Sequence, residues 1–266
     1  MMLIKKLEVL VLGATVSSVL MAAPALAGTV FTDSTFSMSD YIVTSYSGPA
    51  VTTSYGQTPS GNPGTALQGS YSAQGGNASG VLFTAINTNF VYNPGTSGAI
   101  SSLSASLDRF FEPTVNGAPI AVGSYSLRIL AQQDGKIYQS IFTFGPFNQP
   151  GGSWYTLAAT NIQASDFKLF DPANFSAAGS ATGLDFSGAA ITFGFAMRAA
   201  GAVDSNGDPI DLPSSGILRA DNFELSIAPV PGPIVGAGLP GLIAFIGFGL
   251  IGVARRSRRS MSPLAA

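Results

Sequence analysis

Four oxygen-bearing side chains in the last third of the chain have the spacing of a calcium-binding loop. Oxygen ligands at the first, third and fifth positions of a tight loop are what calcium requires. An EF-hand also needs glycine at position six and glutamate at position twelve, where this chain has Pro209 and Ser215. Two interpretations stay open: a calcium-stabilised loop that is not an EF-hand, and an ordinary surface turn rich in Asp, Asn and Gly. The candidate ligands are Asp204, Asn206, Asp208 and Asp211.

Carboxylate side chains could support glycoside hydrolysis without histidine or metal, because that reaction uses two carboxyl groups that flank the scissile bond. None of the available groups stands in a recognisable catalytic pattern. Most fall at predicted strand ends or turns, where aspartate is a common turn residue. A hydrolase of the carboxylate-pair type is therefore an alternative hypothesis and not the leading one. The groups in question are Asp108 with Glu112, Asp134, and Asp166 with Asp171.

Aromatic side chains offer a third kind of chemistry, because the C–H face of a sugar ring packs on a π-face. Trp154 and Tyr155, beside the Gly-rich segment 149–152, are the main candidates for such a ligand platform. A lone tryptophan in a β-sandwich can equally belong to the core, so both interpretations stay open. Further candidates are Tyr41, Tyr46, Tyr55 and Tyr71, whereas Phe142 with Phe144 and Phe193 with Phe195 are spaced two apart and are expected in the core.

The chain contains no cysteine and no histidine. A Ser-His-Asp triad, a Cys-His pair and a His- or Cys-ligated zinc site are therefore excluded. An exported protein without cysteine also gains no stability from disulfides, so its core and sheet pairing must suffice. Apart from calcium at 204–211, no cofactor is expected.

The charge of the central segment argues against nucleic acid as a partner. Residues 28–228 contain 13 acidic side chains, all 14 of the chain except Glu8, and six basic ones, which gives a net charge of about −7. Phosphate binding needs clustered Lys and Arg. The six basic residues are instead scattered along the segment: Arg109, Arg128, Lys136, Lys168, Arg198 and Arg219.

The same segment reads as short β-strands separated by turns. Between Ser102 and Arg109, serines and Asp108 alternate with Leu and Ala, which predicts a strand with one polar and one packed face. Asp134-Gly135 between two apolar runs predicts a β-hairpin. Residues 56–64 are expected to form a loop, and 81–86 and 89–92 two short strands. No segment shows a sustained helical period, so the sequence predicts an all-β domain, an antiparallel and jelly-roll-like β-sandwich over residues 28–228.

Residues 1–27 have the pattern of a secretory signal peptide. Lys5 and Lys6 precede a mostly apolar run from Val9 to Leu20, and Ala25 and Ala27 form a small-x-small cleavage site. An uncleaved anchor helix is the alternative. The protein is therefore expected to be exported.

The C-terminal tail reads as a membrane segment with a basic stop. Pro229, Val230, Pro231, Gly232 and Pro233 form a Pro-rich motif, and an apolar run of 21 residues follows from 234 to 254. At about 1.5 Å per residue this run spans about 31 Å, the thickness of a bilayer core. Arg255, Arg256, Arg258 and Arg259 then mark the cytoplasmic end, and residues 260–266 form a short tail.

The tail resembles the PEP-CTERM sorting signal of Gram-negative bacteria, in the variant with a Gly-Ala-Gly-Leu-Pro-Gly core at residues 236–241. The usual Pro-Glu-Pro is Pro-Val-Pro here. More loosely, residues 28–228 are similar to the β-rich ectodomains found before such tails, with 90–95, 98–102 and 221–225 carrying the likeness. The resemblance implies export by the Sec machinery, recognition by an exosortase-like enzyme, cleavage near residues 229–233, and release to the cell surface or into an exopolysaccharide matrix. A plain type I membrane anchor is the alternative.

Together these features predict an exported, non-catalytic protein of the cell envelope, cell surface or extracellular matrix. Its C-terminal end lies in the cytoplasm before processing. Its partners are expected to be polysaccharide or neighbouring surface molecules. The alternatives are a carboxylate-pair hydrolase and a calcium-stabilised adhesin module on a permanent anchor.

Overall fold

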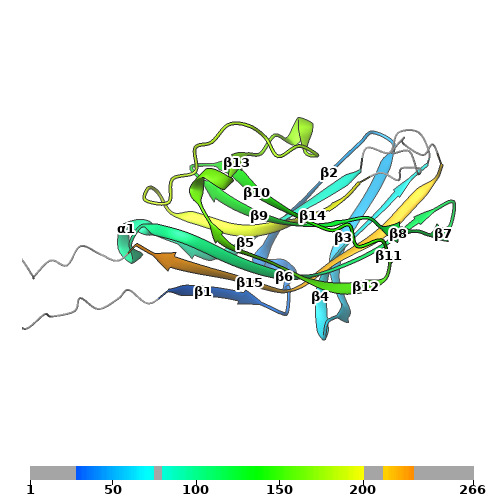
Figure 1. Cartoon of the computed structure of the whole chain (residues 1–266), viewed down its shortest axis with the longest axis horizontal. Coiled ribbons are helices and arrows are strands. Elements are labelled where there is room, and N and C mark those ends of the chain that lie inside the picture. The colour runs from blue at the N-terminus through cyan, green and yellow to red at the C-terminus, as the bar shows by residue number, and fades with distance from the viewer. Residues whose placement is uncertain (1–27, 75–79, 201–211, 231–266) are drawn as a thin grey trace, which may run out of the picture. The chain divides into compact units, whose positions relative to one another are not determined.

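The computed structural model describes residues 28–74, 80–200 and 212–230. Figure 1 shows two packed layers of strands, with β6 and β15 in one layer and β9, β10 and β14 in the other. Every strand pair in the described part is antiparallel. The predicted all-β sandwich is therefore confirmed.

The first layer, sheet A, has seven strands, and its last strand along the chain lies at its centre. β15 is flanked by β6 on one side and by β4 and β1 on the other. The main strand order is β12 (Ser153–Ile162), β6 (Ile100–Val115), β15 (Ser214–Pro229), β4 (Gly64–Ala73) and β3 (Val51–Gly61); β1 (Thr29–Asp33) pairs with β15, and β7 (Ala118–Pro119) with β6.

The second layer, sheet B, has six strands. Their order is β13 (Lys168–Leu169), β10 (Lys136–Phe144), β9 (Tyr125–Gln133), β14 (Ile191–Ala199), β5 (Val81–Tyr92) and β2 (Tyr41–Ser47). A separate pair joins β8 (Ala121–Val122) to β11 (Gln149–Pro150). The helical elements are single turns: α1 (Pro94–Ser97) and the 3₁₀ turns η1 (Met38–Asp40), η2 (Ala164–Asp166) and η3 (Pro172–Asn174).

The core lies between the two sheets and follows the period of two that the sequence predicts. In β6, Leu103, Ala105 and Leu107 are buried, whereas the serines between them are partly or fully exposed. Phe193 and Phe195 of β14 are fully buried, as expected. Phe142 and Phe144 of β10 are partly buried and pack against the same core.

The Asp134-Gly135 hairpin is confirmed. Gln133 pairs with Lys136, so the loop has two residues, and both have positive φ, 51° for Asp134 and 72° for Gly135. Two positive φ angles match the right-handed twist of the flanking strands, and Asp-Gly accepts them at low cost.

Two local expectations were wrong. Residues 56–61 are not a loop but the second half of β3, which pairs with β4 up to Gly61. Pro59 is tolerated there because β3 is an edge strand, where a missing N–H removes no ladder bond. Residues 81–92 form one strand, β5, whose register with β14 shifts between Thr192 and Gly194.

Residues 170–189, which we call the cover, connect β13 to β14. Their first part crosses the outer face of sheet B, and their last part reaches the main core, to which Leu184 and Phe186 belong. On the outer face, Phe170 packs with Leu82, Ile86, Leu130 and Ala196 in a second, smaller apolar cluster. Two buried glutamines hold the cover by hydrogen bonds. Gln133 bonds Asp185 and Ala189, and Gln139 bonds Ala177 and Ala178.

Several expectations lie outside the described residues: the signal peptide with Ala25 and Ala27, the calcium loop 204–211, and the tail from Pro231 through the arginine cluster 255–259. Within the described ranges, no helix has both the length and the apolar character needed to cross a membrane.

Candidate functional site

Trp154 and Tyr155 lie on opposite faces of β12, because successive side chains of a strand alternate. Tyr155 points inward, with its ring centroid 5.0 Å from that of Tyr125 and 4.8 Å from that of Phe147. Trp154 points outward and is partly exposed. The two residues therefore do not form one platform, and of the two only Trp154 faces outward.

The strand register places Trp154 at the end of a row that crosses four strands on the outer face of sheet A. Trp154 of β12 is opposite Phe110 of β6, Phe110 is opposite Arg219 of β15, and Arg219 is opposite Gln68 of β4. We call Trp154, Phe110, Arg219 and Gln68 the outer-face row. Cross-strand neighbours of this kind have Cβ atoms about 4.5–5.5 Å apart, so they interact directly.

Contacts along the row fix its side chains. The Trp154 and Phe110 ring centroids are 5.4 Å apart at an interplanar angle of 49°. The guanidinium carbon of Arg219 lies 4.5 Å from the Phe110 centroid, a cation–π contact, and its Nε donates to Gln68 Oε1 at 2.8 Å. Phe110 is only 7% exposed between these neighbours. The row thus presents an indole face, a guanidinium and an amide in a rigid line.

Polar and small side chains surround the row. One step along the same face, Glu112 of β6, Ile217 of β15 and Ser70 of β4 are opposite one another, and all three are partly exposed. On the other side of the row, Thr156 of β12 is exposed. The face therefore combines one aromatic surface with several hydrogen-bonding groups.

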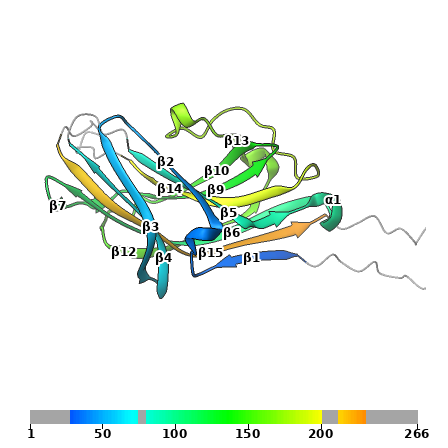
Figure 2. The ribbon, with the colours of Figure 1, turned by 180° about the vertical axis from the view of Figure 1, so that it is seen from behind.

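The turn between β3 and β4, residues 61–64, lies at one end of this face, and we call it the wall. It folds onto Asp108 and Asp221, which are directly opposite each other on β6 and β15. The Asn62 backbone N–H donates to the Asp221 carboxylate, and Asn62 Nδ2 donates to Asp108 Oδ2 at 3.2 Å. Figure 2 shows the β3–β4 hairpin projecting beyond the layer formed by β6 and β15, which agrees with these bonds.

The two carboxylates under the wall are occupied by hydrogen bonds. Asp108 Oδ1 accepts from Thr156 Oγ1 at 2.6 Å, and its Oδ2 accepts from Asn222 Nδ2 at 2.8 Å. Asp221 is fully buried and also accepts from the Asn222 backbone N–H at 2.7 Å. Burial raises the pKa of Asp221 above its ordinary value, and the nearby charges of Asp108 and Asp33 add to this rise.

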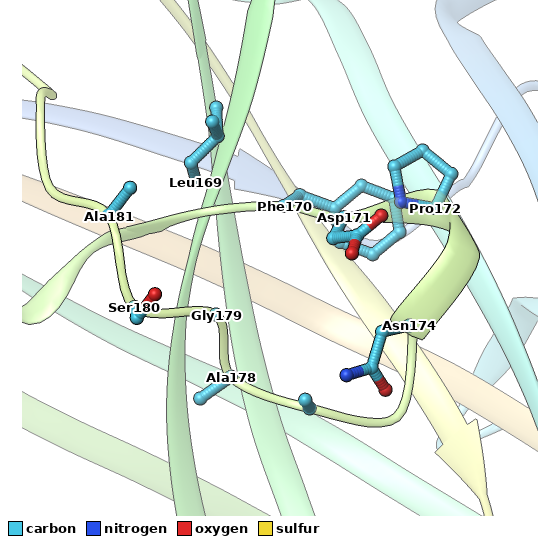
Figure 3. Close-up of a pocket in the computed structure, with 10 residues that line it drawn as sticks. Leu169, Phe170, Asp171, Pro172, Asn174, Ala178, Gly179, Ser180 and Ala181 are labelled. Carbon is cyan, nitrogen blue, oxygen red and sulfur yellow. The ribbon is translucent and has the colours of Figure 1, made fainter.

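The other carboxylates considered for hydrolysis have local roles. Asp166 Oδ2 accepts from the Gln163 backbone N–H at 2.8 Å in a capping box, and Asp134 lies in the hairpin turn. Asp171 Oδ1 accepts from the Ala173 backbone N–H at 2.9 Å and caps η3. Asp171 also borders a cavity of about 600 Å³ within the cover, lined mainly by Leu169, Phe170, Pro172, Asn174 and residues 177–181 (Figure 3). No other carboxylate of the described residues lies in that lining.

The remaining predicted residues do not join the row. Tyr41 and Tyr71 are buried, and Tyr46 packs edge-on against Phe170 with the ring centroids 5.1 Å apart. Tyr55 is 47% exposed on the edge strand β3. In the described ranges, no group of three or more acidic residues is placed to hold a metal ion.

Sequence reasoning missed Phe110, Arg219 and Gln68 as neighbours of Trp154. They are 44, 65 and 86 residues away along the chain, and only the strand register brings them together. A usable signal was the alternation in β6. It places Phe110 on the same face as Asp108 and the serines, where an aromatic residue is out of pattern.

No protein-family model matches this chain, and no curated protein matches it in sequence. Among solved structures, an exo-β-agarase shares 14% identity with a TM-score of 0.32, over 73% of this chain and 24% of the agarase chain. The N-terminal CBM22-1–GH10 modules of Clostridium thermocellum endo-1,4-β-D-xylanase 10B, complexed with xylohexaose, share 9% identity with a TM-score of 0.29, over 80% of this chain and 30% of that chain. This chain thus spans less than a third of either structure. Similarity at this level assigns neither a family nor a function.

Proposed function

We propose that this protein is an exported, non-catalytic surface or matrix protein that binds polysaccharide on the outer face of sheet A. The observation that carries the proposal is the outer-face row, in which a partly exposed tryptophan lies in line with a fixed guanidinium and amide. Export by Sec and processing by an exosortase-like enzyme belong to the same proposal. They rest on the sequence pattern at both ends of the chain.

The chemistry of the row suits a sugar chain. The indole face of Trp154 offers a surface for the C–H face of a sugar ring. Arg219 and Gln68 carry donors and acceptors that can bond hydroxyl groups, and Glu112 adds a carboxylate acceptor one step away. The groups are spread over several strands, so an extended ligand would run across the sheet and meet them in sequence.

A non-catalytic role agrees with the state of the carboxylates. Asp108 and Asp221 are hydrogen-bonded under the Asn62 wall, and Asp166 and Asp171 cap short helical turns. Each of these carboxylates already has a donor, and none of the four is paired with another across an open cleft. We therefore expect a polysaccharide to be held on this face, with the partly exposed Glu112 as a hydrogen-bond acceptor.

Truncation of Trp154 tests the proposal. The full-length protein and Trp154→Ala are compared for binding to the exopolysaccharide of the producing cell, by affinity electrophoresis over a range of polysaccharide concentrations. We expect binding to be at least tenfold weaker in the variant. A loss of this size corresponds to removal of one stacking contact from a water-excluded part of an interface.

Val30→Ala is the control, because it removes part of an exposed apolar side chain from the same sheet, on β1 opposite Ser226 and away from the row. It should leave the affinity unchanged. Equal binding by the native chain and Trp154→Ala would contradict the proposed face, and absence of binding by both would leave the protein a structural role only.

Mass spectrometry of the mature C-terminus, with cell fractionation, tests the sorting part. A chain that ends near Pro233 supports processing by an exosortase-like enzyme. A chain that keeps residues 254–259 and fractionates with the inner membrane would support the alternative of a permanent anchor.

A further inference from the structure

Strands β9 and β14 separate at one end of sheet B and leave a slot between them. Their ladder runs from Thr192 opposite Gln132 to Ala196 opposite Arg128 and then stops. Both strands continue, β9 back to Tyr125 and β14 on to Ala199. The slot that opens there is a cavity of about 110 Å³.

Three arginines from two sheets line this slot, and no carboxylate of the described residues does. Arg128 and Arg198 belong to sheet B. Arg109 comes from β6 of sheet A, on the inward-facing side of that strand, and its Nη2 donates to the backbone O of Arg198 at 2.8 Å. Arg109 is 1% exposed and Arg128 2%. Three of the six basic residues of the domain thus converge on one small cavity.

Several donors of the slot have no hydrogen-bond partner among the described residues. Arg109 Nε and Nη1, Arg128 Nε, Arg198 Nε and the Tyr125 hydroxyl are buried and unbonded. Arg128 does fasten the cover, since its Nη1 donates to Phe175 O at 3.2 Å and its Nη2 to Ser176 O at 3.4 Å. These bonds involve neither Arg128 Nε nor the unbonded donors of Arg109, so they do not explain why those groups are buried.

The charges of the slot persist at neutral pH. Burial lowers the pKa of Arg109 to about 9 and that of Arg128 to about 10, both still well above 7. Burial raises the pKa of Tyr125 to about 12, so its hydroxyl stays protonated and can donate. Buried cations without a counter-charge are costly, and a bound anion that accepts from these donors offsets the cost.

A second, larger cavity adjoins the slot. It has a volume of about 490 Å³ and shares Phe111, Ser124 and Arg198 with the slot. An anionic group fits the small cavity, and the body of a small polar molecule fits the larger one. Guanidinium groups bind oxyanions preferentially, because their fork of N–H donors matches two oxygens at once.

We propose that the slot between β9 and β14 is a binding site for the oxyanion group of a small polar ligand, of which the carboxylate of an acidic sugar is the first candidate. This site is separate from the outer-face row and does not depend on it.

Thermal unfolding of the full-length protein tests the proposal, with glucuronate, sulfate, inorganic phosphate and glucose as probes at matched ionic strength. At saturating concentrations we expect glucuronate to raise Tm by about 2–5 °C and neutral glucose to leave it unchanged. A response to glucuronate alone supports a carboxylate site, and a response to sulfate and phosphate as well supports a general oxyanion site. An equal rise with glucose would overturn the proposal.

Two variants and a control separate specific binding from a general salt effect. Arg198→Gln should weaken glucuronate binding at least tenfold, and Tyr125→Phe about three- to tenfold, because each removes a donor of the slot while Tyr125→Phe keeps the ring. Lys136→Gln removes an exposed positive charge far from the slot along β10 and should bind like the native chain. An unchanged rise in Tm in both slot variants, or no rise with any anion in the native chain, would refute the site.

Discussion

The two outer faces of this sandwich differ in how far other parts of the chain cover them. The first part of the cover lies over the outer face of sheet B and buries Leu82, Leu130 and Ala196 completely. The outer face of sheet A has only the β3–β4 turn folded onto one end, within the described residues, and its central side chains stay partly exposed.

The difference separates a face that stabilises the fold from the face on which we propose that a ligand binds. A covered face buries apolar side chains and holds backbone groups by hydrogen bonds, so it stabilises the fold. An uncovered face that still carries Trp154 and Arg219 in fixed positions gains little stability from them and keeps them available for a ligand. The comparison predicts that similar substitutions on the two faces have very different consequences.

The largest effect should come from Phe170→Ala, which opens the cover. The ring is 7% exposed, and truncating a buried phenylalanine costs about 3–5 kcal/mol of unfolding free energy. Trp154→Ala on the uncovered face should cost about 1 kcal/mol, because its ring is already partly in water. Urea unfolding of both variants measures the difference, and equal losses would break the distinction between the faces.

A smaller effect is expected when the fastening of the cover is cut. Gln133 Nε2 donates to Asp185 O and Ala189 O, both at 2.8 Å, and its Oε1 accepts from the Asp185 N–H at 2.9 Å. Gln133→Met keeps the length but leaves these groups unpaired, at a cost of about 1–3 kcal/mol.

Hydrogen exchange of the Asp185 amide gives the local measurement for this variant, and its protection should fall together with the global stability. Gln68→Met removes one bond, which Gln68 Oε1 accepts from Arg219 Nε, and should cost about 0.5–1 kcal/mol of unfolding free energy. A larger loss at Gln68 than at Gln133 would reverse the comparison.

The smallest effect concerns pH and the wall of the uncovered face. The pKa of Asp221 is raised by burial, so the folded chain holds its proton more tightly than the unfolded chain. The stability contributed by the protonated form is fully present below the ordinary aspartate pKa. It is lost as the pH rises through the folded-state value.

The stability of the native chain relative to Asp221→Asn should therefore shrink as the pH rises from acid to neutral. Urea midpoints of both proteins at several pH values measure this difference. A native advantage that grows with pH would show that hydrogen bonds from Asn62 and Asn222 outweigh burial at this carboxylate.

Much of the fold was predictable because its signals are local. Alternating residues in β6 and the Asp134-Gly135 pair each specify a strand or a turn within a few positions. The second half of β3 was missed because Gly56 and Pro59 read as turn residues. Only the pairing with β4, a tertiary fact, makes that segment a strand.

The candidate sites were less predictable, because each depends on register between distant strands. Trp154 was singled out by residue type, but its separation from Tyr155 follows from strand alternation and its neighbours follow from the order β12, β6, β15 and β4. Arg109 carried a local signal, since the alternation places it on the same side as Leu107. Its meeting with Arg128 and Arg198 could not be read from the sequence, because it depends on how the two sheets pack.

The central position of β15 has a mechanical consequence. β1 begins and β15 ends at the same edge of the domain, where Thr29 is opposite Ile227. A pull that separates these two ends would peel their bonds one after another. A force applied between Pro229 and a ligand bound on the outer face would instead load the ladders of β15 with β6 and β4 along their length. Many bonds would then share the force. Of the two directions of pull, the second is therefore resisted by more backbone bonds at the same time.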